Sequence, residues 1–132
     1  MTVNATVLAV DDNEAHRYFV SRTLEEAGMR PIAVRTGTEA LEKAKDRPDL
    51  ILLDVHLPDL DGFEVCRRLK ADPATADIPV VMFSSISQSG AAVNDARQLG
   101  AAAFLFFPMV QDHLVSVVLG TLSASKSKTP TK

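Results

Sequence analysis

The chain has 132 residues, of which 46% are apolar and 23% charged, and its net charge at pH 7 is −3. A chain of this length fits one domain, its acidic balance argues against a nucleic-acid partner, and no apolar run reaches the roughly 18 residues of a membrane span. The one cysteine, Cys66, excludes an internal disulfide and fits a reducing, cytoplasmic location.

Five short apolar runs alternate along the chain with five amphipathic ones. The apolar runs are rich in Val, Ile, Leu and Phe and show little polar alternation, which is typical of strands buried on both faces. We expect strands at Thr6–Val10, Arg30–Val34, Leu50–Leu53, Val80–Phe83 and Ala102–Phe106.

The segments between these runs carry apolar residues at helical spacing. Thr36 and Glu39 form a capping-box pattern at the start of one of them, and Gly28 and Gly100 can end two others. This strict alternation predicts an α/β fold, a five-stranded doubly wound parallel sheet with helices on both faces. We expect one domain over residues 1–122 and a disordered basic tail over residues 123–132, which hold three lysines and no acidic residue.

Polar residues that share a chemistry follow three of the predicted strands. The first strand ends in Asp11 and Asp12, the third in Asp54 and the fourth in Ser84. A single aspartate after a strand would indicate only a loop or a helix cap. Here such residues follow three strands, and ligand sites of such sheets lie past the carboxyl ends of the strands. Clustered carboxylates repel one another unless a cation is bound, and oxygen ligands suit Mg²⁺. An aspartate can also attack phosphorus and form an aspartyl phosphate.

The segments around these aspartates resemble one protein family. VLAVDDNE, ILLDVHLPDLDGFEVCRRLK and IPVVMFSS, in this order and spacing, are similar to the receiver domains of bacterial two-component response regulators. The resemblance runs from about Val7 to Leu122 and implies the flavodoxin-like receiver topology. No glycine-rich phosphate loop of the GxxxxGK[ST] or GxGxxG type accompanies it.

The resemblance implies a role for each matching residue. Asp54 matches the phosphoacceptor, and Asp11, Asp12 and Asp54 match the carboxylates that hold Mg²⁺. His56 matches the position whose backbone carbonyl binds the metal. Ser84 matches the hydroxyl residue that moves toward the phosphoryl group.

The end of the last strand departs from the family pattern. The family has GAxxYLxKP, whereas this chain reads GAAAFLFFP, so Phe107 stands where a lysine is expected. That lysine would form a charge-assisted hydrogen bond with the phosphoryl group or with Asp54. We therefore expect phosphorylation that is slower or less stable, and weaker coupling to the signalling face. An aromatic residue at the mouth of the site would oppose this effect by limiting water entry and slowing hydrolysis. The resemblance also implies a cis peptide bond before Pro108.

Two phenylalanines, Phe104 and Phe106, share one side of the predicted last strand at the edge of the sheet. Phe104 matches the family's aromatic residue whose rotamer reports phosphorylation. The pair forms either core beneath the flanking helices or an apolar signalling face for a dimer or another partner. His16 and His113 lie on predicted helices, and we interpret both as surface residues.

Two functions fit this sequence. The first is a receiver that accepts a phosphoryl group on Asp54 from a histidine kinase or phosphotransfer protein with Mg²⁺. It would signal to a downstream protein or form a homodimer through the last strand and its flanking helices. The second is a phosphorylation-independent pseudo-receiver that acts as an interaction or dimerisation module.

Catalytic activity would be at most self-phosphorylation from a phosphohistidine donor and autodephosphorylation. The segment around Asp54 also resembles receivers attached to sensor kinases, so a fragment of such a kinase is a further reading of the chain. Neither nucleic acid nor a membrane is expected as a partner.

Overall fold

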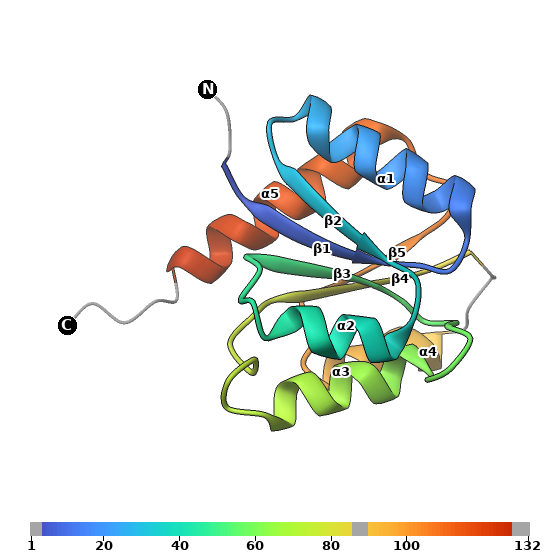
Figure 1. Cartoon of the computed structure of the whole chain (residues 1–132), viewed down its shortest axis with the longest axis vertical. Coiled ribbons are helices and arrows are strands. Elements are labelled where there is room, and N and C mark those ends of the chain that lie inside the picture. The colour runs from blue at the N-terminus through green and yellow to red at the C-terminus, as the bar shows by residue number, and fades with distance from the viewer. Residues whose placement is uncertain (1–3, 86–89, 128–132) are drawn as a thin grey trace.

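The structure, a computed structural model, describes residues 4–85 and 90–127, with the last two of these in backbone only. Within these ranges five parallel strands form one sheet in the order β2-β1-β3-β4-β5 (Figure 1). The predicted sheet is therefore confirmed. Its strands are β1 (Thr6–Val10), β2 (Arg30–Val34), β3 (Leu50–Asp54), β4 (Val80–Ser84) and β5 (Ala103–Phe106).

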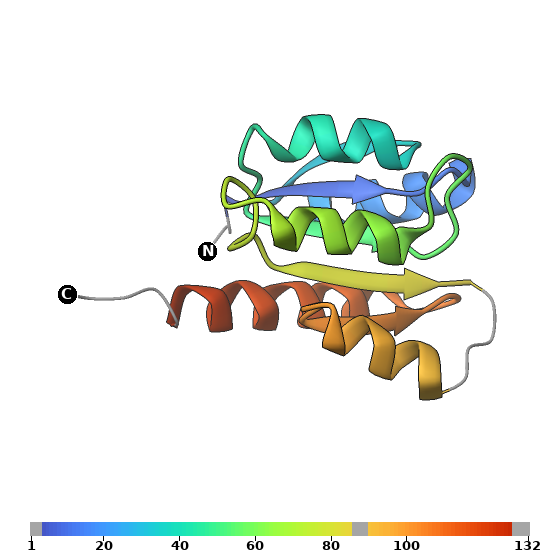
Figure 2. The same ribbon diagram turned by 90° about the horizontal axis from the view of Figure 1, so that it is seen from below.

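Helices cover both faces of the sheet. Two of them, α1 (Glu14–Glu26) and α5 (Gln111–Ser127), pack on one face, and the remaining three pack on the other (Figures 1 and 2). Those three are α2 (Gly37–Ala44), α3 (Gly62–Ala71) and α4 (Gly90–Gln98). The strands alternate side chains between the two resulting cores, which is why every residue of β3 and β4 is buried.

The helix boundaries follow from local chemistry. Asn13, Thr36 and Asp61 have extended backbones, and their side chains accept amide hydrogen bonds from the first turns of α1, α2 and α3. Gly28 and Gly100 follow α1 and α4 with φ angles of 88° and 101°, a conformation that side chains disfavour. The capping residue Thr36 and the two terminal glycines are thus confirmed.

Three predicted strand boundaries were wrong by one residue, and the predicted end of the last helix was wrong by several. β3 and β4 each extend one residue further, to Asp54 and Ser84, and β5 begins at Ala103 rather than Ala102. Helix α5 continues to Ser127, five residues into the segment predicted to be disordered. A helix that is already nucleated extends at little cost through serine, alanine and lysine, so polar composition alone did not end it. Residues 128–132 of that predicted tail lie outside the described residues.

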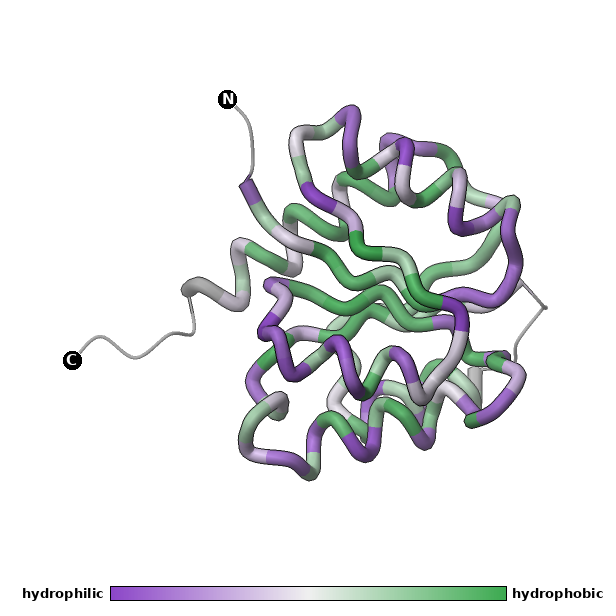
Figure 3. The backbone as a smooth tube through the Cα atoms, viewed as in Figure 1, coloured by the Kyte–Doolittle hydropathy of each residue, from purple (hydrophilic) through white to green (hydrophobic). Residues whose placement is uncertain are grey.

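Hydropathy matches this layered arrangement. The strands form an apolar centre, and polar residues gather on the outer faces of the helices and in the loops (Figure 3). Among the described residues, no helix combines the length and the apolar character that crossing a membrane requires.

Candidate functional site

Three carboxylates meet at the carboxyl edge of the sheet. Val10 pairs with Leu53 across β1 and β3, so the residues that follow them, Asp11 and Asp54, emerge side by side. With Asp12 they form a group whose ligand oxygens all lie within 4.8 Å of one another. Asp11 is 2% exposed and Asp54 6% exposed, whereas Asp12 reaches solvent. The predicted cluster is therefore present, and two of its members are buried.

Burial makes the ionised form of Asp54 costly. Removal from water, followed by the charge of the neighbouring Asp11, raises the pKa of Asp54 to about 8, although the amide of His56 favours the carboxylate. That amide donates to Asp54 Oδ1 at 3.1 Å. In the metal-free protein burial thus favours the protonated carboxyl group, and a bound cation would favour the carboxylate.

The loop after β3 is held tightly against the end of that strand. Gly62, the first residue of α3, donates its amide hydrogen to the Val55 carbonyl at 2.7 Å. A Cβ atom on Gly62 would lie 2.7 Å from the Val55 Cα and would collide with the Asp54 carbonyl. The close approach of α3 to the end of β3 therefore requires a glycine at this position.

Asp59 ties the same loop to the first turn of α2. Its carboxylate accepts from the amides of Gly37 and Thr38 at 2.8 and 2.9 Å, and from the Thr38 hydroxyl at 2.6 Å. The hydroxyl and then the two amides hold the pKa of this exposed carboxyl group below its usual range. Sequence reasoning missed this contact because it joins residues 21 and 22 positions apart.

Ser84 ends β4 beside the acidic cluster. Asp54 pairs with Phe83 across β3 and β4, so Ser84 comes one position further along the same edge. Its side chain is buried, and its backbone carbonyl accepts from the Phe107 amide at 2.9 Å. The fourth strand therefore brings a hydroxyl residue to the edge where the carboxylates lie, as predicted.

Phe107 turns its ring toward α1. It stacks on His16, with ring centroids 4.3 Å apart and an interplanar angle of 3°. Its edge contacts are with Phe19 and Phe83, at centroid distances of 5.8 and 5.3 Å. Phe107 thus belongs to the core on the α1 and α5 face, and the peptide bond that follows it is cis, as predicted.

His16 is not the surface residue that the sequence predicted. Its side chain is 23% exposed, and Nδ1 lies 2.9 Å from Asp11 Oδ2. The error arose because helical periodicity was considered without the strand end that precedes the helix. One signal was available, since a residue in the first turn of α1 lies close to Asp11, five positions earlier. His113, on α5, is exposed as predicted.

Comparison with known proteins decides which family this arrangement belongs to. The profile of the response regulator receiver domain matches residues 7–119. The chain belongs to this family. It is 39% identical over 108 residues to the response regulator PleD of Caulobacter vibrioides, a match that covers 81% of this chain and 24% of PleD. The chain therefore spans about a quarter of that relative's length.

Two further comparisons support the same family. The polar-differentiation response regulator DivK of Brucella anthropi is 33% identical over 114 residues, which cover 86% of this chain and 92% of DivK. The signal receiver domain of a signal transduction histidine kinase from Syntrophus aciditrophicus superposes with a TM-score of 0.83 at 32% identity. That match covers 97% of this chain and 95% of the other. Similar receivers thus occur in response regulators and in a histidine kinase.

The two phenylalanines of β5 differ in their exposure to solvent. Phe104 is half-buried and packs on the core beneath α2, α3 and α4, whereas Phe106 is 44% exposed. Their rings touch, with centroids 5.1 Å apart. Phe104 therefore packs as part of the core, whereas Phe106 lies on the exposed edge of the sheet.

The acidic cluster of this receiver fits a magnesium ion. Asp11, Asp12 and Asp54 supply hard oxygen ligands, and an ion that keeps several waters needs only one or two of them. Burial first, and then the charge of Asp11, raises the pKa of Asp54, so the carboxylate form is disfavoured without a cation. A bound divalent cation would favour the carboxylate form.

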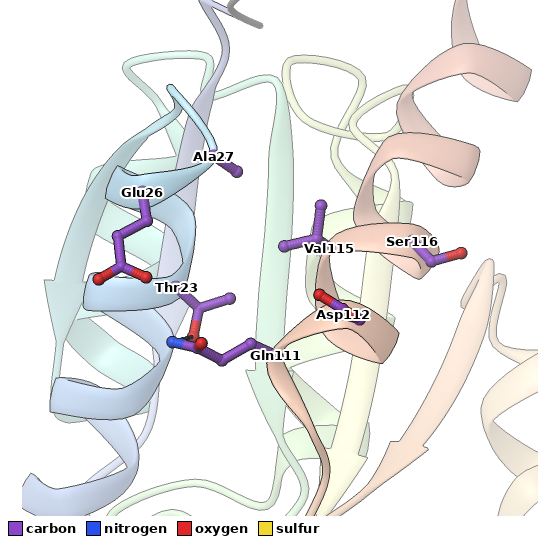
Figure 4. A pocket seen from close by; sticks show the side chains of 7 residues that line it. All are labelled: Thr23, Glu26, Ala27, Gln111, Asp112, Val115 and Ser116. Atoms are coloured by element: carbon purple, nitrogen blue, oxygen red, sulfur yellow. Dashed lines mark hydrogen bonds between the residues drawn. The ribbon is translucent and has the colours of Figure 1, made fainter.

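Two surface hollows have different relations to this cluster. One, of about 390 Å³, lies between α1 and α5, where Gln111 donates to the Thr23 hydroxyl at 3.1 Å (Figure 4). None of the residues expected to act in the receiver lines it. The other, of about 400 Å³, is lined by His16, Phe107 and their neighbours, and so adjoins the site.

Proposed function

We propose that this receiver accepts a phosphoryl group on Asp54 from a histidine kinase or a phosphotransfer protein. The reaction depends on Mg²⁺, takes place in the cytoplasm, and is followed by contacts with a downstream protein. One observation carries the proposal: Asp54 is buried at the carboxyl edge of the sheet, with the ligand oxygens of Asp11 and Asp12 within 4.8 Å.

Each residue of the site has a separate role in the proposed phosphoryl transfer. An Asp54 oxygen attacks phosphorus, the bond from phosphorus to the donor imidazole breaks, and the product is an aspartyl phosphate. The His56 amide holds Asp54 Oδ1, and its carbonyl is our proposed further metal ligand. The Ser84 hydroxyl donates to a phosphoryl oxygen. Bound Mg²⁺ supplies positive charge for the incoming phosphoryl group.

Phe107 removes one interaction from this scheme. A lysine at its position would contribute a charge-assisted hydrogen bond, worth roughly 1.5–3 kcal/mol. A tenfold rate effect needs about 1.4 kcal/mol, so this loss alone would slow the reaction or shorten the lifetime of the phosphate by one to two orders of magnitude. An aromatic ring that limits water entry would act in the opposite direction on that lifetime. The carboxylates and Ser84 still allow the reaction itself.

A second function, the phosphorylation-independent pseudo-receiver, is favoured by a specific observation. Phe107 is built into the aromatic packing of the α1 and α5 face, so the end of β5 lacks the cation that would respond to a phosphoryl group. In that case the exposed edge at Phe106 is the surface of interaction or dimerisation. Both functions fit a free-standing receiver and a receiver within a larger sensor kinase.

Intact-mass spectrometry separates these two functions. The protein is incubated with Mg²⁺ and acetyl phosphate, and in parallel with a phosphorylated histidine phosphotransfer protein, beside Asp54→Asn and Ser84→Ala. We expect a phosphate adduct on the wild-type chain, a smaller one on Ser84→Ala, and none on Asp54→Asn. Absence of an adduct with either donor would reject the phosphoacceptor and leave the pseudo-receiver.

A further inference from the structure

His16 connects the aromatic end of β5 with the acidic cluster. Its Nδ1 lies 2.9 Å from Asp11 Oδ2, and its ring lies parallel to that of Phe107, with centroids 4.3 Å apart. The side chain of Asp11 is 3% exposed. The hydrogen bond is therefore shielded from water on its Asp11 side, whereas the His16 ring is partly exposed.

The backbone and the ring of His16 are each held by a separate contact. Its backbone amide donates to Asn13 Oδ1 at 2.9 Å, the capping bond that starts α1. Phe107, on which the ring stacks, is itself held by edge contacts with Phe19 and Phe83. With the ring held in this way, its Nδ1 is directed at one point.

That point is one of the two Asp11 carboxylate oxygens. In the tautomer whose Nδ1 carries the ring proton, that N–H donates to Oδ2. The other oxygen, Oδ1, accepts from the Asn13 amide at 2.9 Å. These two contacts prevent the carboxylate from rotating, and Asp54 also forms a side-chain hydrogen bond with Asp11. Each oxygen has two lone pairs, so a cation that displaces the Asp54 contact can bind the carboxylate without breaking the other two.

We propose that His16 is a positioning residue of the magnesium site: held by the ring of Phe107, it orients the Asp11 carboxylate for the cation. This inference rests on the proposed function, because it needs a cation at the cluster. The same proposal assigns a role to Phe107. The residue in the place of the lysine supports a metal ligand through His16, rather than contacting the phosphoryl group.

Calorimetric titration with Mg²⁺ tests this role directly. His16→Leu removes the donor, His16→Gln keeps an N–H donor on a flexible chain, and Phe107→Leu removes the stacking partner but stays apolar. The matched control is His113→Leu, which removes an exposed histidine from the first turn of α5. Thermal unfolding of each variant in EDTA separates loss of stability from loss of binding.

We expect His16→Leu to weaken Mg²⁺ binding about tenfold, the lower end of what loss of an outer-sphere partner costs. His16→Gln should recover part of that loss, Phe107→Leu should weaken binding by less than His16→Leu, and His113→Leu should bind as the wild type does. Unchanged or tighter binding by His16→Leu would overturn the proposal. Failure of the wild type to bind Mg²⁺ at millimolar concentration would instead reject the proposed function.

Discussion

At the ends of β1 and β3 three carboxylates crowd together, whereas at the end of β5 the side chains are aromatic. The acidic half crowds buried carboxyl groups together, and burial followed by the charge of Asp11 raises the pKa of Asp54. The aromatic half has a packed ring where the family pattern predicts a lysine, since Phe107 lies against His16, Phe19 and Phe83. Under the proposed function, this site keeps the carboxylates that would accept a phosphoryl group and has a phenylalanine in place of the lysine that would contact it.

The tightest contact of the acidic half gives the largest expected effect. In Gly62→Ala the new Cβ meets backbone atoms of Asp54 and Val55, which cannot move aside without displacing the end of β3. We expect a loss of about 3 kcal/mol in the free energy of unfolding, measured by urea denaturation. Gly120→Ala is the control: its Cβ meets nothing within 4 Å, and alanine favours a helix, so stability should stay equal or rise by up to about 1 kcal/mol. Equal effects at both glycines would contradict the described packing.

Replacing the aromatic residue of the other half tests whether packing has taken the place of charge. Phe107→Lys restores the cation of the family pattern but removes the ring from its three aromatic neighbours. We expect a loss of about 2 kcal/mol in stability, because Phe107 is partly buried, and a smaller loss in Phe107→Leu. Thermal unfolding measures both. A lysine variant as stable as the wild type would show that the ring contributes little to the core.

The charge of the acidic half predicts a pH dependence. The folded metal-free protein holds the Asp54 proton up to about pH 8, whereas the unfolded chain releases it near pH 4. Between these values the folded state binds more protons, so its stability falls as the pH rises. Asp54→Asn removes this dependence, and at pH 8 in EDTA it should exceed the wild type by at least about 1.4 kcal/mol, the equivalent of one pKa unit. Urea unfolding at pH 5 and 8 measures the difference between the two proteins. A difference that stays constant with pH would contradict the raised pKa.

The exposed edge gives the smallest expected effect on stability. Phe106→Ser changes a side chain that is 44% exposed, so its unfolding free energy should fall by less than about 1 kcal/mol. If β5 is the signalling face, the same variant should weaken self-association or partner binding in analytical ultracentrifugation and pull-down assays. A large loss of stability would instead make Phe106 part of the core, and the aromatic half would then lack an exposed side chain on β5.

The acidic half was accessible from the sequence and the aromatic half only in part. Asp11 and Asp54 follow apolar runs, and parallel strands bring such ends together. The pattern of apolar and polar residues was therefore sufficient to predict that these carboxylates cluster. The stacking of Phe107 on His16 depends on how α1 lies across the sheet, which no local pattern encodes. The extension of α5 to Ser127 was missed for a related reason, because helix propagation depends on the turns that precede a segment as well as on its composition.

Mass analysis of the peptide that contains Asp54 tests the central claim most directly. The wild-type protein is treated with the phosphorylated phosphotransfer protein, once with Mg²⁺ and once with EDTA. Our account predicts a phosphate on Asp54 that forms with Mg²⁺ and fails to form in EDTA. Equal labelling in EDTA, labelling at another residue, or no labelling in Mg²⁺ would contradict it.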